Sequence, residues 1–212
     1  MTLKPISIRA LSGVLGGDVL GIDLSAAPAA IACALAAALR EHAVLVCRDG
    51  NIRPEAARLL VRLLSQDARF HCAASGGLPP SRFAEMMDPA WQQERPAAIL
   101  VCAEQLPHRG GESIWSSLHA AYRSLSAPMR RYLATLNAAH GRRDGHAEIW
   151  RPLIAPHPVT GEACLDFSPD YTHEIGGVPD EESRLILKLL RNHVYKPENQ
   201  TRIPWSEGMF VL

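Results

Sequence analysis

The residues best suited to chemistry lie in one stretch near the middle of the chain. Asp88 precedes an apolar run, Ala97 to Ala103, and two glycines, Gly110-Gly111, lead into Ser113. This stretch is a candidate edge of an active site, since a carboxylate and a hydroxyl border a strand that is expected to be buried. Both residues also have a structural interpretation. Asp before Pro89 is typical of a cap or turn, and Ser after Gly-Gly is typical of a turn that enters a strand.

Other chemistry-bearing residue types form no recognised pattern. The five cysteines are scattered without a CxxC pair, which argues against a disulfide framework, a structural zinc site and a catalytic thiol. The sequence has no GxSxG elbow and no glycine-rich phosphate loop. No two histidines have the i, i+4 spacing of a helical metal site, which favours surface or locally hydrogen-bonded side chains. The histidines that could still replace a metal ligand are His71, His108, His119, His140, His146, His157 and His173.

The composition is that of an ordinary globular protein. The chain has 212 residues, of which 47% are hydrophobic, so we expect one domain with a substantial core over residues 1–212. Its 22 basic and 22 acidic residues balance, and nothing indicates a nucleic-acid or membrane-surface partner. The sequence shows neither a long transmembrane run nor a signal-peptide pattern, which predicts a cytoplasmic protein.

Short strands and a few helices must position the candidate residues. The predicted strands lie within 6–24, 43–48, 97–103 and 163–167. The predicted helices are 28–42, 54–64, 116–125, 127–138 and 183–193, with loops at 75–81 and 141–151 and an apolar run at 209–212. Since the strands and helices show no regular βαβ rhythm, an α+β or decorated all-β architecture is favoured.

Taken in order, several segments resemble the taurine dioxygenase (TauD/TfdA) family of Fe(II)- and 2-oxoglutarate-dependent oxygenases. Each match is weak by itself, but their common order covers nearly the whole chain. The resemblance implies a double-stranded β-helix (jelly-roll) core with flanking helices, within an α+β or mainly β fold. The segments that carry it are 15–24, 39–49, 96–113, 120–126, 157–161 and 205–208, the fifth of which reads His-Pro-Val-Thr-Gly.

The resemblance implies where a metal and a cosubstrate would bind. The family's first metal motif is W-H-x-D, and its His and Asp are two of three iron ligands. Counting back from Gly110-Gly111 places Asp88 at the Asp, Met86 at the His and Glu85 at the Trp. The resemblance also places Ser113 at a family Thr that helps to bind 2-oxoglutarate. Fe(II) and 2-oxoglutarate are thus the implied cofactors, and hydroxylation of a small organic acid is the implied reaction.

The chain departs from the family pattern in ways that affect this chemistry. Met86 offers a soft, uncharged thioether where imidazole is expected, and a thioether is a poor ligand for Fe(II). The family's second metal-binding His and its 2-oxoglutarate-binding Arg would follow Leu212, so both are expected to be absent, together with the last core strands. These departures predict a catalytically impaired dioxygenase. The alternative is a non-catalytic pseudoenzyme that acts as a binding or assembly module, and a homo-oligomer is a further expectation.

Overall fold

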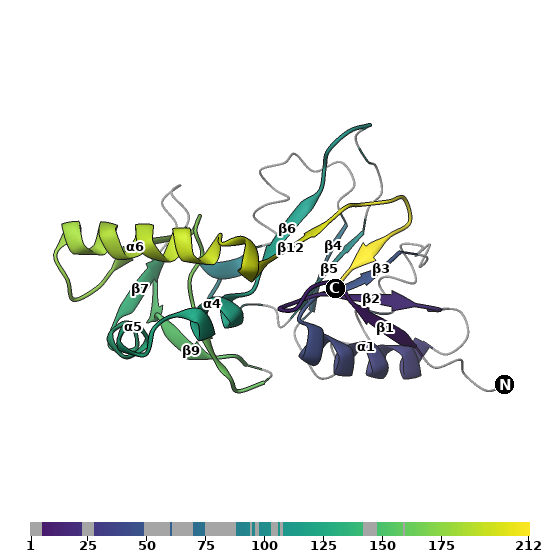
Figure 1. The fold of residues 1–212 in the computed structure, drawn as a ribbon, viewed down its shortest axis with the longest axis horizontal. Coiled ribbons are helices and arrows are strands. Elements are labelled where there is room, and N and C mark those ends of the chain that lie inside the picture. The colour runs from purple at the N-terminus through teal and green to yellow at the C-terminus, as the bar shows by residue number, and fades with distance from the viewer. Residues whose placement is uncertain are drawn as a thin grey trace. The chain divides into compact units, whose positions relative to one another are not determined.

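The chain forms two compact units (Figure 1). Unit 1 comprises Met1–Met87, Pro96–Trp115 and Thr201–Leu212, and unit 2 comprises Asp88–Arg95 and Ser116–Gln200. The computed structural model describes residues 6–22, 28–48, 60, 70–74, 88–93, 95, 98–102, 106, 108–141, 148–158 and 160–212. Among these residues, no helix is long and apolar enough to cross a membrane.

Unit 1 is built on a mixed six-stranded sheet. In sheet order the strands are β1 (Ser7–Ala10), β2 (Gly17–Leu20), β3 (Leu45–Cys47), β13 (Phe210–Val211), β5 (Ala98–Cys102) and β4 (Phe70–Ala74). The pairs β2–β3 and β4–β5 are parallel, and the other pairs are antiparallel. The predicted apolar strands at 43–48 and 97–103 are therefore confirmed as β3 and β5. The apolar run at 209–212 contributes β13, which lies between them.

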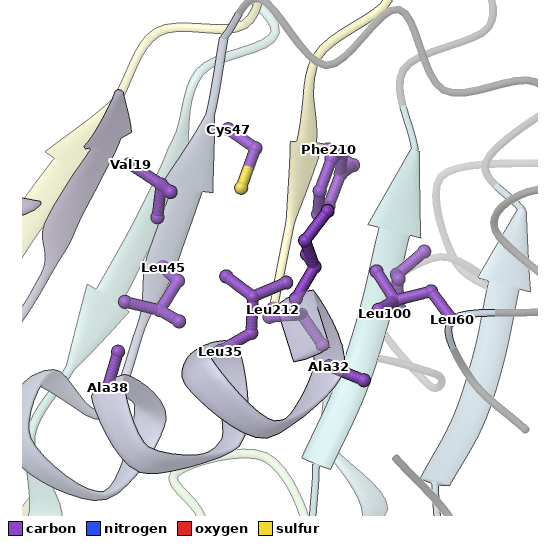
Figure 2. Packing of buried hydrophobic residues seen from close by; sticks show 11 residues of the cluster. Val19, Ala32, Leu35, Ala38, Leu45, Cys47, Leu60, Leu100, Phe210 and Leu212 are labelled. Carbon is purple, nitrogen blue, oxygen red and sulfur yellow. The ribbon is translucent and has the colours of Figure 1, made fainter. Parts of the chain in front are cut away.

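Both faces of this sheet are apolar at its central strands β3 and β13, because side chains alternate along a strand. Leu45 and Cys47 belong to one buried cluster, whereas Val44 and Val46 belong to the other. Figure 2 shows the first cluster, in which Leu35 of α1 (Pro28–His42) lies beside side chains from the strands. The predicted helix at 28–42 is confirmed with the same bounds. Continuous apolar runs thus indicated strands that are buried on both faces.

Ala43, which follows α1, adopts a conformation that favours glycine. Its φ is 59°, in the left-handed region, while its N–H donates to the Leu39 carbonyl oxygen over 2.9 Å. This conformation costs a residue with a Cβ roughly 1–2 kcal/mol, and glycine avoids that cost while losing more chain entropy on folding. An Ala43→Gly substitution is therefore expected to raise the free energy of unfolding by about 0.5–1 kcal/mol.

Urea unfolding followed by circular dichroism measures this change. The matched control is Ala37→Gly on the exposed side of the same helix. Glycine there is expected to lower the free energy of unfolding by about 1 kcal/mol, because it occupies a helix interior. Equal destabilisation by both substitutions would contradict the assignment of strain to Ala43.

Unit 2 combines small antiparallel sheets with three α-helices. One sheet has the order β11 (Thr172–Ile175), β7 (Asn137–His140) and β8 (Ile149–Pro152), and β9 (Ile154–Pro156) pairs with β10 (Ala163–Leu165). The helices are α4 (Leu118–Ser124), α5 (Ala127–Leu133) and α6 (Asp180–Val194), with 3-10 turns η1 (Pro89–Trp91) and η2 (Pro197–Asn199). Their apolar faces share a core that includes Leu133, Leu153 and Leu190. A further two-stranded sheet pairs β6 (Ser113–Ser116) with β12 (Gln200–Ile203), and all but one residue of each strand belongs to unit 1.

The structure corrects two predicted elements. The helix predicted at 127–138 ends at Leu133, and Asn137–His140 forms the central strand β7. Ala138 and Ala139 favour helix by intrinsic propensity, but each is fully buried in a strand with a partner on either side, and this packing overrides propensity. The loop predicted at 141–151 is also wrong at its end, because Ile149–Pro152 is strand β8.

The remaining element predictions divide into confirmed and untested ones. Strands within 6–24 and 163–167 and the helices near 116–125 and 183–193 are confirmed, and mixed sheets with separate helices make the fold α+β. Ser126 caps α5 by accepting a hydrogen bond from the Met129 N–H over 3.3 Å. The predicted helix at 54–64, apart from Leu60, and the predicted loop at 75–81 lie outside the described residues.

Candidate functional site

Asp88 opens the first segment of unit 2 and starts the short η1 turn. Its Oδ1 accepts a hydrogen bond from the Ala90 N–H over 3.0 Å, which is the geometry of a capping aspartate before Pro89. Burial raises the pKa of the Asp88 carboxyl, while hydrogen bonds from the Ser168 side chain and the Ala90 backbone oppose that rise. Asp88 therefore makes the capping contact that its position before Pro89 indicated.

A buried carboxylate, Asp166, connects the same segment to strand β10. Both oxygens of Asp166 accept from Arg95, with Nη1–Oδ1 and Nη2–Oδ2 distances of 2.9 Å, and Oδ2 also accepts from Arg151 Nε over 2.9 Å. Arg151 further donates from Nη2 to the Ala90 carbonyl oxygen over 2.5 Å and from Nη1 to that of Gln92 over 3.4 Å. Two guanidinium groups therefore hold the Asp88–Arg95 segment against β8 and β10.

His140 lies beside this network with no exposed surface. Its Nδ1 is 3.0 Å from the Thr172 hydroxyl, which accepts from the Ser168 N–H, and its Nε2 is 3.8 Å from Asp166 Oδ1. A proton on Nε2 suits both neighbours, because the Thr172 O–H can then donate to Nδ1 and the Nε2–H dipole points at a carboxylate. Burial first, and then the positive charge of Arg151, lowers the pKa of His140 to about 4.

Ser113 lies in unit 1, at the start of β6. Its Oγ accepts two indole N–H groups, from Trp115 over 2.8 Å and from Trp205 over 3.0 Å. A serine hydroxyl has two acceptor lone pairs and one proton, whereas an indole nitrogen can only donate. Both lone pairs are therefore used, and the hydroxyl proton is the part of Ser113 that can contact a ligand.

In the described part of the chain, Asp88 is the one predicted metal ligand whose surroundings can be compared with an iron centre. Within the described residues, no group of three or more His, Cys, Asp or Glu side chains could hold a metal ion. Asp88 supplies one carboxylate, and Met86 and Glu85 lie outside the described residues. Ser113 does fit a carboxylate ligand, because its free proton is a hydrogen-bond donor. Asp88 belongs to unit 2, whereas Ser113 belongs to unit 1.

Two other histidines have carboxylate partners, and three of the cysteines can be described. His119 contacts Glu162 and His173 contacts Glu148, each over 2.8 Å, as local partners on the surface. Cys33, Cys47 and Cys164 are free. Burial, and secondarily the charge of Asp18, raises the pKa of the Cys47 thiol far above its usual range, so this group is not a nucleophile at neutral pH.

Sequence reasoning missed the Asp166 network. Asp166 stands alone as a charge within the apolar run Ala163–Phe167, and an isolated charge in a buried strand requires a partner. That signal could have identified Asp166, although not Arg95, which lies 71 positions away. Trp115 and Trp205 pack against an apolar cluster, and both also donate to Ser113.

Comparisons with known proteins agree with the resemblance found in the sequence. The family described as "Taurine catabolism dioxygenase TauD, TfdA family" matches residues 7–212. The alpha-ketoglutarate-dependent sulfate ester dioxygenase of Pseudomonas putida is 23% identical over an alignment that covers 96% of this chain and 79% of that protein. The alpha-ketoglutarate-dependent dioxygenase cnsP of Penicillium expansum is 30% identical over an alignment that covers 59% of this chain and 39% of that protein.

The similarity extends to solved structures. A taurine dioxygenase from Burkholderia xenovorans superimposes with a TM-score of 0.78 at 26% identity, over 97% of this chain and 78% of that one. Two of the curated relatives, at 33% and 30% identity, are matched over only 35% and 39% of their length. The family match nevertheless runs through nearly the whole sequence. The chain therefore belongs to the TauD/TfdA family of alpha-ketoglutarate-dependent dioxygenases.

Proposed function

We propose that this chain is a 2-oxoglutarate-dependent dioxygenase of small organic acids whose iron centre is impaired. Family membership and the activities named for its relatives, among them a sulfate ester dioxygenase, support the reaction class. In this proposal residues 1–212 form one cytoplasmic TauD/TfdA domain with a jelly-roll core and flanking helices, Asp88 is an iron ligand, and Ser113 contacts a carboxylate of 2-oxoglutarate.

The impairment rests on one observation, the residue two positions before Asp88. Met86 stands where a W-H-x-D motif has its imidazole ligand, and a thioether binds Fe(II) weakly. The surroundings of Asp88 add to this effect, because Oδ1 already accepts a hydrogen bond from the Ala90 N–H over 3.0 Å. A carboxylate oxygen that is committed to a turn is less available to a metal ion than a free one.

An anaerobic titration with Fe(II) and 2-oxoglutarate tests the proposal. The weak visible charge-transfer band of the ternary complex reports binding. The wild-type chain is expected to bind iron weakly, and Met86→His is expected to raise the affinity by at least about tenfold, or about 1.4 kcal/mol, because imidazole replaces the thioether. Met87→His is the matched control, since it adds the same side chain one position away.

Three results would contradict parts of this proposal. A clear band from the wild-type chain at stoichiometric iron would overturn the impairment. An equal gain from Met87→His would overturn the assignment of Met86 to the ligand position. Failure of both the wild-type chain and Met86→His to bind iron would favour the non-catalytic binding or assembly module.

A further inference from the structure

We propose that Trp115 and Trp205 are positioning residues that hold the Ser113 hydroxyl as a hydrogen-bond donor for a bound carboxylate. The inference rests on the proposed function, in which that carboxylate belongs to 2-oxoglutarate. It adds two residues that do not touch the ligand and act through Ser113.

Ser113 has a limited hydrogen-bond capacity, with one proton and two acceptor lone pairs. An unconstrained serine hydroxyl rotates about its C–O bond and can donate or accept. Here Trp115 Nε1 and Trp205 Nε1 lie 2.8 Å and 3.0 Å from Oγ, and both can only donate. Two donors on one oxygen leave the O–H pointing away from both indoles. A ligand therefore meets a donor of fixed direction, which suits an anionic acceptor such as a carboxylate.

The indole rings of Trp115 and Trp205 are themselves held in place by packing. Trp115 is two residues after Ser113 on β6, so the two side chains share a face of that strand. Trp205 follows β12. Both rings pack against one apolar cluster of unit 1, whose buried members are Leu15, Val44, Val46, Ile203, Met209 and Val211. Because packing fixes the rings, the N–H groups reach Ser113 from directions set by the fold.

The backbone on either side of Ser113 is also constrained. Gly110 and Gly111 have φ values of 74° and 81°, a left-handed pair that turns the chain into β6. Glu112 Oε2 accepts from Arg202 Nη1 of β12 over 2.7 Å, next to the serine. The position of the Ser113 backbone is thus set by the turn and by the pairing of β6 with β12, and the direction of its hydroxyl is set by the indoles.

A purely structural role makes a different prediction. If Ser113 only satisfies two half-buried indole N–H groups, its removal would loosen the cluster without a specific effect on ligand binding. If the indoles position the hydroxyl, then removing their N–H groups should weaken carboxylate binding, and only while the hydroxyl is present. A double-mutant cycle separates these roles.

The first measurement needs no ligand. The indole ¹H–¹⁵N signals of the full chain are assigned by tryptophan-to-phenylalanine variants, which keep an aromatic ring and remove the N–H. Ser113→Ala is expected to shift the signals of Trp115 and Trp205 and to leave that of Trp150, an exposed residue of β8, in place. Unchanged signals for both Trp115 and Trp205 would overturn the proposal.

The second measurement is the affinity for 2-oxoglutarate, read from the shifts of the same signals or by calorimetry. Ser113→Ala is expected to weaken binding by about tenfold or less, because one charge-assisted hydrogen bond is lost. The double variant Trp115→Phe/Trp205→Phe is expected to have an effect of the same size, because that hydrogen bond is misaligned. The triple variant is expected to bind no more weakly than Ser113→Ala alone. Trp150→Phe, at an exposed residue of β8, should keep the wild-type affinity.

The outcomes distinguish this inference from the proposed function. If Ser113→Ala weakens binding but the double tryptophan variant does not, the positioning role is overturned while the 2-oxoglutarate site stands. If the double variant weakens binding equally with and without the serine, the tryptophans act through packing and the inference is again overturned. If the wild-type chain binds no 2-oxoglutarate, both proposals fail together.

Discussion

An Asp166→Asn variant is expected to lower the free energy of unfolding by about 3 kcal/mol, since removing one partner of a buried ion pair leaves an uncompensated charge. Asp166 is 4% exposed and accepts hydrogen bonds from both Arg95 and Arg151. Asparagine keeps the size of the side chain but loses its charge. The Arg151 side chain is 15% exposed and cannot reach water readily, whereas the Arg95 side chain is 39% exposed and can be solvated. Because only one of the two cations stays buried, the expected loss lies at the lower end of the range for buried pairs.

Chemical denaturation of Asp166→Asn measures this effect, and Glu162→Gln is the matched control. Glu162 also forms an ion pair, with His119 over 2.8 Å, but it is exposed, and surface pairs contribute about 0–1 kcal/mol. Hydrogen exchange adds a local measurement. The Ala90 N–H, which is bonded to Asp88, should exchange faster in Asp166→Asn because Arg95 and Arg151 no longer hold the segment. Equal destabilisation by both substitutions would contradict the special role of Asp166.

The same residues show how far the sequence could predict the structure. The bounds of α1 and the buried strands β3 and β5 follow from local apolar patterns, and these predictions are confirmed. Asn137 and Ala138, the first two residues of β7, were predicted as the end of a helix. The alanines of β7 are instead stabilised by partners on β8 and β11, which no local pattern reveals. Short-range periodicity carries information about elements but not about which elements pair.

The candidate site divides in the same way. Asp88 and Ser113 could be selected by order along the chain, through the resemblance to a family. Their partners could not be selected, since Trp205 is 92 positions from Ser113, and Ser168 is far from Asp88 in sequence. Pairing over such separations is fixed by the folded core and not by neighbouring residues. The sequence therefore predicts candidate residues better than it predicts what holds them.

Acidification is expected to destabilise the wild-type chain through His140, and a His140→Gln variant should lack this part of the pH dependence. Burial and the charges of Arg151, Arg95 and His173 lower the pKa of His140 from 6.5 to about 4, against the opposing charge of Asp166. Between these two values the unfolded chain binds a proton that the folded chain does not. The stability that neutral His140 contributes is therefore fully present above pH 6.5 and is lost as the pH falls towards 4. The difference in pKa corresponds to on the order of 3 kcal/mol.

Urea unfolding at several pH values between 4 and 7 measures this loss. His140→Gln is expected to be less stable than the wild-type chain at pH 7, because glutamine replaces a well-packed ring. The quantity to compare is therefore the slope of the free energy of unfolding against pH, and not its value at one pH. Asp88 acts with the opposite sign, since its pKa is raised and the folded chain takes up its proton first, but both proteins share that contribution. The difference between the two curves isolates His140. If the two curves run parallel from pH 7 to pH 4, His140 is not held neutral by the fold, and the charges of Arg95 and Arg151 do not act on it as the structure indicates.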